Sequence, residues 1–435
     1  IYLAFCKTEN LTSEGYFSYV KDFKGGHNLN ATAGYSYFEV NGENFGMDNY
    51  NFSVDGIKYW DIGQGSYLTD GKAGMSSGKS VTERLFSFFA RANYSYQDKY
   101  MLSASIRHEG SSKFAADNRW ANFWSATAGW RISNEEFMKD FDWLDDLKIR
   151  FGYGVTGNND FSATYMANML GSDTNWMMPN GTWAYSYGKS QNVNPNLGWE
   201  EKKEWNLGVD YSFFEGRLYG KFDYYRREVD NLLFSVKVPQ PPYTQGSQMQ
   251  NIGSMESKGW EFEVGGDIIR TKGFTWSSSM NLSHNTGKIL TLEGENSYHN
   301  GNGFVAPGTP GDAARMEAGS TIGSFYMWKF AGFDDEGSFL LYNKDGEVIP
   351  AAQKKENDKQ YIGNYTPKLI IGWSHTLTYK NFDLGINLRS WIDFDVFNTI
   401  NMYYGLSEVA GQNVLRNAYI DNRHIKEVKQ LCDYW

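Results

Sequence analysis

Alternation of apolar and small polar side chains over long segments is the feature that most limits what this chain can fold into. In LFSFFARANYSYQDKYMLSASIRHEG (85–110) the alternate apolar positions are Phe86, Phe88, Ala90, Ala92, Tyr94, Tyr96, Leu102, Ala104 and Ile106. The same pattern recurs in 124–132, 147–154, 205–213, 260–264, 274–282 and 382–388. Successive residues of a strand point to opposite faces, so the pattern predicts strands with one apolar and one wet face.

The length of these segments favours a membrane barrel over a soluble β-sandwich. They run for about 9 to 11 residues or more, enough for a tilted strand to cross a bilayer, whereas strands of globular proteins average about 5 to 6 residues. Aromatic residues make up 17% of the chain and gather near the segment ends, like the girdles of outer-membrane barrels. The polar face carries mainly Ser, Thr, Asn, Gly and Arg. We therefore predict an all-β fold, a transmembrane antiparallel up-and-down β-barrel.

The connections between the segments predict the topology. Short turns fall at 23–27, 96–100, 213–217, 270–274 and 379–383, and long Gly- and Asn-rich stretches fall at 41–80, 157–198, 231–257, 287–318 and 343–366. Outer-membrane barrels have short periplasmic turns and long extracellular loops. If all short turns share one side, the segments 274–283, 320–331 and 368–378 need a fourth strand, for which 337–342 (GSFLLY) is the candidate. This makes about fourteen strands, and the abrupt chain ends indicate an internal piece of a longer protein.

Charge and motifs argue against several classes of function. The net charge of -10 disfavours nucleic-acid binding, which needs basic stripes. Cys6 and Cys432 fit no metal or disulfide spacing, and the six histidines, among them His299 and His424, form no HExxH motif. GMSSGKS (74–80) lacks the first glycine of a phosphate loop. We therefore expect no enzyme, no metal site and no resident cofactor.

Two alternatives stay open at this level. NKDGE (343–347) offers Asn343, Asp345 and Glu347 to Ca²⁺, but the full loop spacing is absent and an Asp-Gly turn is the preferred interpretation. His375 lies four residues before a short turn, where an outer-membrane lipase could hold a catalytic histidine. Without an identifiable serine partner, an interfacial histidine beside the aromatic girdle is preferred.

Two groups of side chains are candidates for binding. TNWMMPNGTWAYSYG (174–188) places Trp176, Trp183, Tyr185 and Tyr187 in a long loop, where they either stack on a sugar or pack the loop's own small core. The second group, Arg91, Arg107, Arg131 and Arg150, is predicted to face the lumen. These arginines are expected to pair with carboxylates such as Glu204, Asp210, Glu261 and Glu263, or with a plug.

Several stretches resemble the SusC-like TonB-dependent transporters. They are EGSSKFAADNRWANFWSATAGWRISNEEFM (109–138), LKIRFGYGVTGNNDF (147–161), NPNLGWEEKKEWNLGVDYSFFEGRLYGKFDYYRREVDNLL (194–233), NIGSMESKGWEFE (251–263), TIGSFYMWKFAGF (321–333) and YKNFDLGINLRSW (379–391). The resemblance spans about 81–435 and implies part of a roughly 22-stranded β-barrel with an N-terminal plug in its lumen. We expect residues 1–435 to be a partial barrel without the plug, the TonB box or the closing C-terminal strands.

The resemblance also implies a function and partners. SusC-like transporters import oligosaccharides, or in some members peptides, across the Gram-negative outer membrane. They pair with a SusD-like surface lipoprotein and draw energy from the TonB–ExbB–ExbD complex, and they contact membrane lipid and lipopolysaccharide. We therefore expect a glycan importer in the outer membrane, with a peptide importer and a non-transporting receptor or adhesin barrel as the alternatives.

Overall fold

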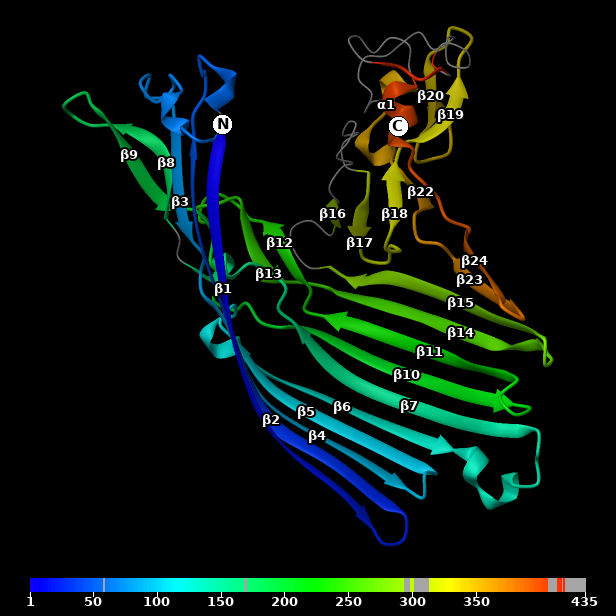
Figure 1. The fold of residues 1–435 in the computed structure, drawn as a ribbon. Coiled ribbons are helices and arrows are strands. Elements are labelled where there is room, and N and C mark those ends of the chain that lie inside the picture. The colour runs from blue at the N-terminus through cyan, green and yellow to red at the C-terminus, as the bar shows by residue number, and fades with distance from the viewer. Residues whose placement is uncertain are drawn as a thin grey trace. The chain divides into compact units, whose positions relative to one another are not determined.

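The computed structural model describes residues 1–57, 59–167, 170–292, 298–300, 313–405, 413–416 and 418 (Figure 1). Cys432 and His424 lie outside these residues, as does much of the predicted long connection 287–318. The chain divides into two compact units. Unit 1 comprises 1–129, 152–203 and 231–252, and unit 2 comprises 130–151, 204–230 and 253–435.

Long antiparallel strands, hydrogen-bonded in chain order, make up most of the structure. They are β1 (Tyr2–Phe23), β2 (His27–Asp48), β4 (Glu83–Tyr96), β5 (Tyr100–Ser111), β6 (Trp120–Arg131), β7 (Leu144–Asn158), β10 (Glu200–Phe213), β11 (Leu218–Asp230), β14 (Ser254–Arg270), β15 (Phe274–Thr291), β23 (Leu369–Tyr379) and β24 (Phe382–Ile392), with β3 (Gly74–Lys79) paired to β2. Each strand pairs with the strand that precedes it in this series, which is an up-and-down order. The predicted all-β antiparallel fold is confirmed.

Shorter elements occupy the long connections. They are β8 (Leu170–Met177), β9 (Trp183–Lys189), β12 (Leu233–Lys237), β13 (Ser247–Asn251), β16 (Tyr298–Asn300), β17 (Arg315–Glu317), β18 (Ser324–Met327), β19 (Lys329–Phe333), β20 (Phe339–Tyr342), β21 (Val348–Pro350), β22 (Gln360–Asn364) and α1 (Thr399–Tyr404). Single 3₁₀ turns are η1 (Asp55–Ile57), η2 (Ile62–Gln64), η3 (Ala116–Asn118), η4 (Ile132–Asn134), η5 (Glu136–Met138), η6 (Ala163–Met166), η7 (Ala351–Gln353) and η8 (Glu356–Asp358). Within the described residues, no helix has the length and apolar character needed to span a membrane.

The strand register keeps the apolar positions on one face. Between β4 and β5, Ala90 lies opposite Ile106, while Arg91 lies opposite Ser105 on the other face. The apolar face is not covered by a second protein layer, since Phe88 is 53% exposed and Leu384 55% exposed. A soluble sandwich would bury these side chains between its sheets. The alternation therefore produces a sheet whose apolar face is open to lipid.

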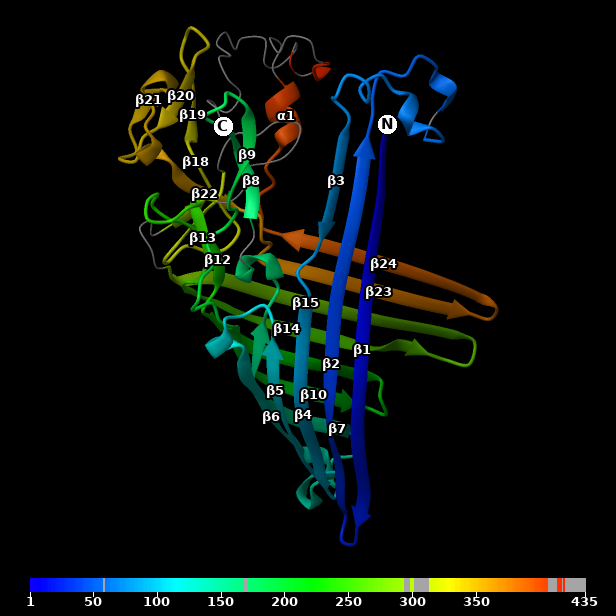
Figure 2. The ribbon, with the colours of Figure 1, turned by 90° about the vertical axis from the view of Figure 1, so that its left-hand side faces the viewer.

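In unit 1 the long strands β1, β2, β4 and β5 run side by side (Figure 2). Two rows of aromatic rings border their apolar face. The row near the short turns contains His27, Tyr94, Tyr96 and Tyr100, and the row near the long loops contains Tyr37, Phe86 and Trp120. From His27 to Tyr37 the chain covers about 33 Å of strand, or about 25 Å across a membrane at a tilt of about 40°. This separation matches the apolar band of an outer-membrane barrel.

Two barrel strands predicted from the sequence are wrong. Segment 320–331 forms β18 and β19, which pair with β22 and β20, and segment 337–342 contains β20, which lies between β19 and β21. β15 instead pairs directly with β23, so an even number of long strands joins the two short turns without them. Phe339 and Leu341 of β20 alternate like barrel residues but are buried in a small core. The long sheet therefore has fewer strands than the predicted fourteen.

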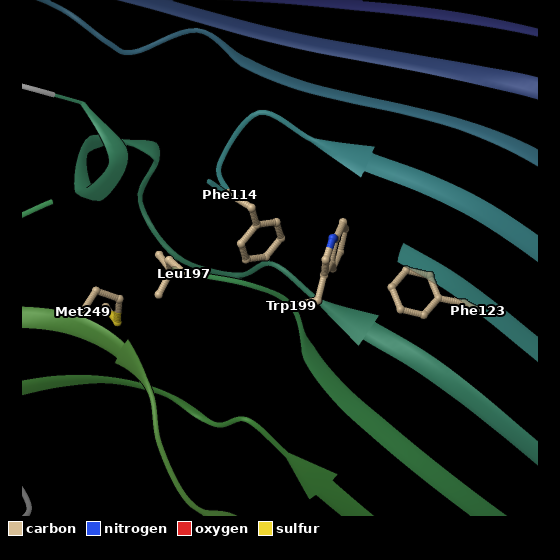
Figure 3. Close-up of a cluster of buried hydrophobic side chains, with 5 residues drawn as sticks. All are labelled: Phe114, Phe123, Leu197, Trp199 and Met249. Carbon is tan, nitrogen blue, oxygen red and sulfur yellow. The ribbon is translucent and has the colours of Figure 1, made fainter. Parts of the chain in front are cut away.

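Unit 1 has its own apolar core, at the ends of the strands that carry the long loops. Phe114, Phe123, Leu197, Trp199 and Met249 form one buried cluster (Figure 3). The rings of Phe114 and Trp199 lie 4.6 Å apart, and the Trp199 indole N–H donates to the Arg119 carbonyl at 3.0 Å. Burying a large apolar side chain stabilises by about 1.5–3 kcal/mol. This core anchors three loop segments to the strand ends.

Candidate binding platform

The hairpin β8–β9 presents three of the four predicted aromatic residues on one face. Trp183, Tyr185 and Tyr187 alternate along β9 and are 64%, 73% and 70% exposed. Trp176 lies opposite Ala184 in the register, whereas Met177 lies opposite Trp183, so Trp176 belongs to the other face of the hairpin. The structure thus brings three of the predicted residues together and separates the fourth from them.

These aromatic residues do not form the core of their loop. That core is made by the cluster around Phe114 and Trp199, against which Phe161, Tyr165 and Met166 pack. These residues could not be predicted as a core from the sequence, because they lie in loops without a periodic pattern. The four predicted side chains are left exposed above it.

A buried asparagine holds the segment after the hairpin to the β12–β13 connection. Asn192, 8% exposed, donates from Nδ2 to the carbonyls of Gln245 and Ser247 at 2.7 and 2.9 Å. Its Oδ1 accepts from the Thr244 and Gln245 amides and from the Thr244 hydroxyl at 3.1–3.3 Å. One buried side chain therefore binds four backbone groups and the Thr244 hydroxyl, and its own polar atoms are satisfied, as burial requires.

Further amides continue this connection toward the core. Asn251 accepts from the Gly198 amide and donates to the Gly198 carbonyl, both at 2.8 Å. Asn194 donates to the Met249 carbonyl at 3.0 Å, and Gln248 donates to the Val193 carbonyl at 3.1 Å. Side-chain amides, together with one backbone bridge between Asn192 and Gln248, thus join 192–198 to 244–251 and fix the base of the β8–β9 hairpin.

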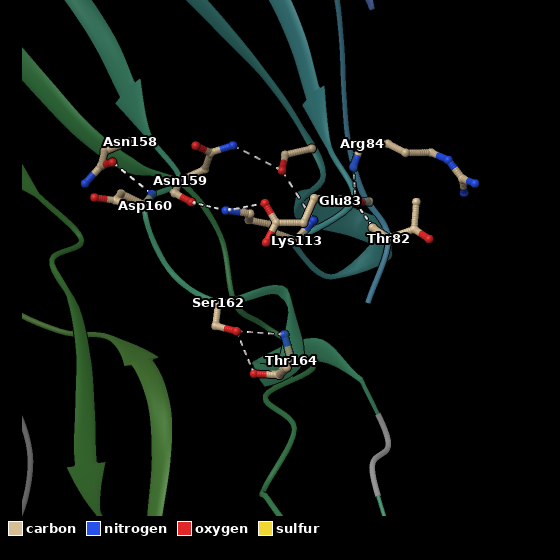
Figure 4. Close-up of polar contacts among 11 residues, drawn as sticks. Thr82, Glu83, Arg84, Lys113, Asn158, Asn159, Asp160, Ser162 and Thr164 are labelled. Atoms are coloured by element: carbon tan, nitrogen blue, oxygen red, sulfur yellow. Dashed lines mark hydrogen bonds and ion pairs between the residues drawn. The ribbon is translucent and has the colours of Figure 1, made fainter. Parts of the chain in front are cut away.

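Lys113 forms a second anchor in unit 1 (Figure 4). Its ammonium lies 3.0 Å from a Glu83 carboxylate oxygen, donates to the Asn159 carbonyl at 3.4 Å and lies 5.9 Å from the centre of the Phe161 ring. The side chain is only 14% exposed. A largely desolvated cation needs such partners, so Lys113 ties the start of the 159–199 loop to Glu83, the first residue of β4.

In unit 2, Arg150 binds two carboxylates on neighbouring strands, those of Asp210 and Asp223. Its guanidinium makes a two-pronged contact with Asp210 at 2.8 Å and also donates to Asp223 at 3.2 Å. Gly208 makes room for this arrangement, because a Cβ there would lie 2.6 Å from Asp223 Oδ1 and 2.7 Å from Arg150 Cζ. Two parallel N–H···O bonds make the Arg–carboxylate fork geometrically specific.

The other predicted arginines also contact polar neighbours. Arg131 lies 3.2 Å from Asp146, Arg107 binds Glu109 at 3.0 and 3.2 Å, and Arg91 donates to Asn93 at 3.3 Å. Of the predicted carboxylate partners, Asp210 binds Arg150, while Glu204 and Glu263 pair with Arg227 and Lys221.

The alternative sites from the sequence find local partners. Asn343 Oδ1 accepts from the Asp345 and Glu347 amides at 3.0 and 2.8 Å, the geometry of an Asx turn. In the described part of the chain, no three His, Cys, Asp or Glu side chains lie close enough together to hold a metal. His375 accepts from the Trp276 indole at 3.3 Å and lies 4.6 Å from the Trp373 ring. It therefore sits among interfacial aromatic residues.

In the small sheets of unit 2, burial raises the pKa of Tyr361 to about 12, and a hydrogen bond to Glu317 adds to the shift. The Tyr326 and Tyr361 rings lie 5.1 Å apart. The neutral phenol is therefore the form that the folded structure stabilises.

Comparison with known proteins decides the family. Residues 6–410 match the family described as TonB dependent receptor-like, beta-barrel. The chain belongs to this family. TonB-dependent receptor P3 of Formosa agariphila is 32% identical over 418 residues, which are 90% of this chain and 39% of that protein. TonB-dependent receptor SusC of Bacteroides thetaiotaomicron is 32% identical over 340 residues, 75% of this chain and 33% of that protein.

A solved structure extends the likeness to the fold. The RagAB peptide transporter superimposes with a TM-score of 0.76 at 25% identity, over 93% of this chain and 43% of that chain. The chain thus spans well under half the length of these relatives. The predicted resemblance to SusC-like TonB-dependent transporters is confirmed. The family is non-enzymatic and resides in the outer membrane, as expected from the sequence.

Proposed function

We propose that the protein containing this chain imports oligosaccharides across the outer membrane by TonB-dependent transport. The observation that carries this proposal is the exposed row of Trp183, Tyr185 and Tyr187 on a loop hairpin with an anchored base. Large aromatic side chains left in water on one face are a usual sign of a binding surface. Membership in the TonB-dependent receptor family supports the transport step.

The spacing of the row suits an extended ligand. Alternate residues of a strand lie about 7 Å apart, so the three rings offer a sequence of stacking positions along β9. The face of an aromatic ring is electronegative and attracts the polarised C–H groups on the apolar face of a sugar. The hydroxyl groups at the edge of a stacked sugar remain free to form hydrogen bonds with other polar groups. An oligosaccharide with several exposed C–H faces therefore fits this surface.

Peptide import is the second candidate, because the structural neighbour with a TM-score of 0.76 is described as a peptide transporter. The same rings can pack against apolar side chains of an extended peptide. The two candidates differ in which ligands compete for the row, and binding experiments with both ligand classes separate them.

The partners form part of the proposal. We propose a SusD-like surface lipoprotein at the long-loop side and energy from the TonB–ExbB–ExbD complex. The SusC relative and the RagAB neighbour support both, as proteins with which this chain shares its barrel. A barrel that only binds its ligand, as a receptor or adhesin, would accumulate nothing inside the cell.

The test uses the full-length protein with its lipoprotein partner. Binding of an oligosaccharide panel and of a peptide panel is measured by calorimetry, and uptake of labelled ligand is measured in cells with and without a proton uncoupler. The triple variant Trp183→Ala, Tyr185→Ala, Tyr187→Ala should weaken oligosaccharide binding by roughly 100-fold, since stacking contacts of this size contribute about 1 kcal/mol each. Uptake should require the proton-motive force.

Two matched variants control for non-specific effects. Trp176→Ala removes an equally exposed ring from the opposite face of the same hairpin, and Phe137→Ala removes an exposed ring from η5. Both should bind normally. Loss of peptide binding alone in the triple variant would favour the second candidate, and uncoupler-insensitive uptake, or no uptake, would contradict TonB-dependent import.

A further inference from the structure

The outward face of unit 1 carries two hollows, one above the other, on the same strands. The lower hollow has a volume of about 520 Å³ and lies between the two aromatic rows. Its floor is made by alanines, Ala31, Ala33, Ala90, Ala92 and Ala104, with Phe17 and Ile106 beside them. The register places these apolar side chains on the same face as Phe88, which is open to lipid. A bilayer chain is the natural occupant of a groove at this depth.

The upper hollow has a volume of about 350 Å³ and begins where the outer aromatic row ends. On β2, Glu39 follows Tyr37 by two residues and so points to the same face. Arg84, opposite Glu39 in the register, precedes Phe86 by two residues and so points to the same face. This hollow therefore faces outward at the level of the lipid headgroups, on the long-loop side.

Charged groups of both signs line the upper hollow. Arg84 and Glu39 pair at 2.8 Å, and Lys7 and Glu9 pair at 2.7 Å. Lys79 lies opposite Glu43 in the β2–β3 register and makes no ion pair with any described residue. Three cations beside three carboxylates suit a ligand that has both phosphate and hydroxyl groups, because ammonium and guanidinium groups bind phosphate while carboxylates accept from hydroxyls.

The vertical distance between the hollows fits one amphipathic molecule. From Glu39 to Ala33 the strand covers about 20 Å, or about 15 Å along the membrane normal at the usual tilt, which equals the hydrocarbon depth of one leaflet. A headgroup in the upper hollow therefore lets its acyl chain pass the aromatic row and reach the alanine floor. Neither hollow alone has this property.

We propose that the outward face of β1, β2, β4 and β5 is a binding site for a phosphorylated glycolipid of the outer leaflet, with its sugar phosphate in the upper hollow and an acyl chain in the alanine groove. This site faces away from the transport path and does not depend on the proposed substrate. It holds a lipid of the outer leaflet against the strands that support the loops.

The test titrates rough-form lipopolysaccharide onto the delipidated full-length protein and counts bound molecules by native mass spectrometry. Lys7→Gln with Lys79→Gln should weaken binding by roughly fivefold, the effect of removing two exposed charge contacts. Ala90→Leu with Ala92→Leu should weaken it by a similar factor, because the added methyl groups fill the groove. Melting followed by circular dichroism shows that each variant is folded.

Matched variants lie on the same face outside the hollows. Lys21→Gln changes a lysine near the short turn of β1, and Ala128→Leu enlarges an exposed alanine of β6 that does not line the groove. Neither should alter binding. Equal binding by all variants would overturn the proposal, as would equal competition by deacylated headgroup, by a simple phospholipid or by free phosphate. A change in self-association in place of lipid binding would identify a second copy of the chain as the occupant and also overturn it.

Discussion

Replacing Asn192 with alanine should release the base of the β8–β9 hairpin without unfolding the sheet. The two bonds donated by its Nδ2, at 2.7 and 2.9 Å, are well formed, and the three contacts to its Oδ1 share one acceptor. Counting about 1 kcal/mol for each donated bond and about 1 kcal/mol for the shared acceptor, the local loss is about 3 kcal/mol. The site is buried, so water cannot easily replace the lost partner.

Hydrogen exchange measures this loss directly. The amides of Thr244 and Gln245 bind Asn192 Oδ1, and their exchange should accelerate by roughly 100-fold in Asn192→Ala, as about 3 kcal/mol of local opening requires. Peptides from the long strands should exchange at the wild-type rate. The measurement uses the full-length protein in detergent or nanodiscs with mass spectrometry.

A control variant and a second substitution at Asn192 distinguish loss of these hydrogen bonds from a general effect of removing an asparagine side chain. Asn180 accepts from the Thr182 amide at 3.1 Å in the exposed hairpin turn, so Asn180→Ala should leave exchange at 244–247 unchanged. Asn192→Asp keeps an acceptor but places a carboxylate against the carbonyls of Gln245 and Ser247, and it should be at least as damaging as alanine. Wild-type exchange at Thr244 and Gln245 in Asn192→Ala would refute the assignment of this side chain as the link.

Two further predictions concern unit 2. Gly208→Ala should lower the free energy of unfolding by about 1–3 kcal/mol, because its Cβ would displace Asp223 or Arg150. A Cβ at Gly385 meets no atom within 4 Å, so Gly385→Ala should leave the free energy of unfolding unchanged. Calorimetry in detergent compares the two variants. Tyr361, with its pKa raised to about 12, should stabilise its small sheets fully below about pH 10 and progressively less as the pH rises to about 12. Near-UV circular dichroism should show this alkaline loss in the wild type and a weaker one in Tyr361→Phe; an identical pH profile in both would contradict it.

The long strands were predictable because their physical constraint is simple and periodic. A strand with lipid on one side must place apolar residues at every second position, and a shift of one residue would reverse both faces. The predicted positions of Ala90 and Arg91 on opposite faces follow directly and agree with the register. The expectation that all short turns share one side predicted a barrel strand at 337–342, and Phe339 and Leu341 of β20 do alternate there, but a small protein core covers them instead of lipid. Period two identifies a face but not what covers it.

The binding platform was only partly predictable because its stability comes from contacts without a period. Asn192 and Asn251 bind backbone groups more than fifty residues away in the chain, and nothing in the local pattern identifies such partners. The density of asparagine and glutamine in NVNPNLGW and TQGSQMQN is the one sequence signal for them, since these amides can satisfy both donors and acceptors of irregular backbone.

The aromatic candidates show how structure sharpens a compositional prediction. The sequence groups four rings in one loop, but strand pairing sets the face to which each ring points. A register shifted by one residue would have placed Trp176 on the same face as Trp183 and Tyr185. With the observed register, a ligand that lies along β9 meets three rings and cannot meet the fourth. The contrast between Trp176→Ala and the triple variant therefore tests the direction of the hairpin as well as its function, which no loss of activity in a single variant could do.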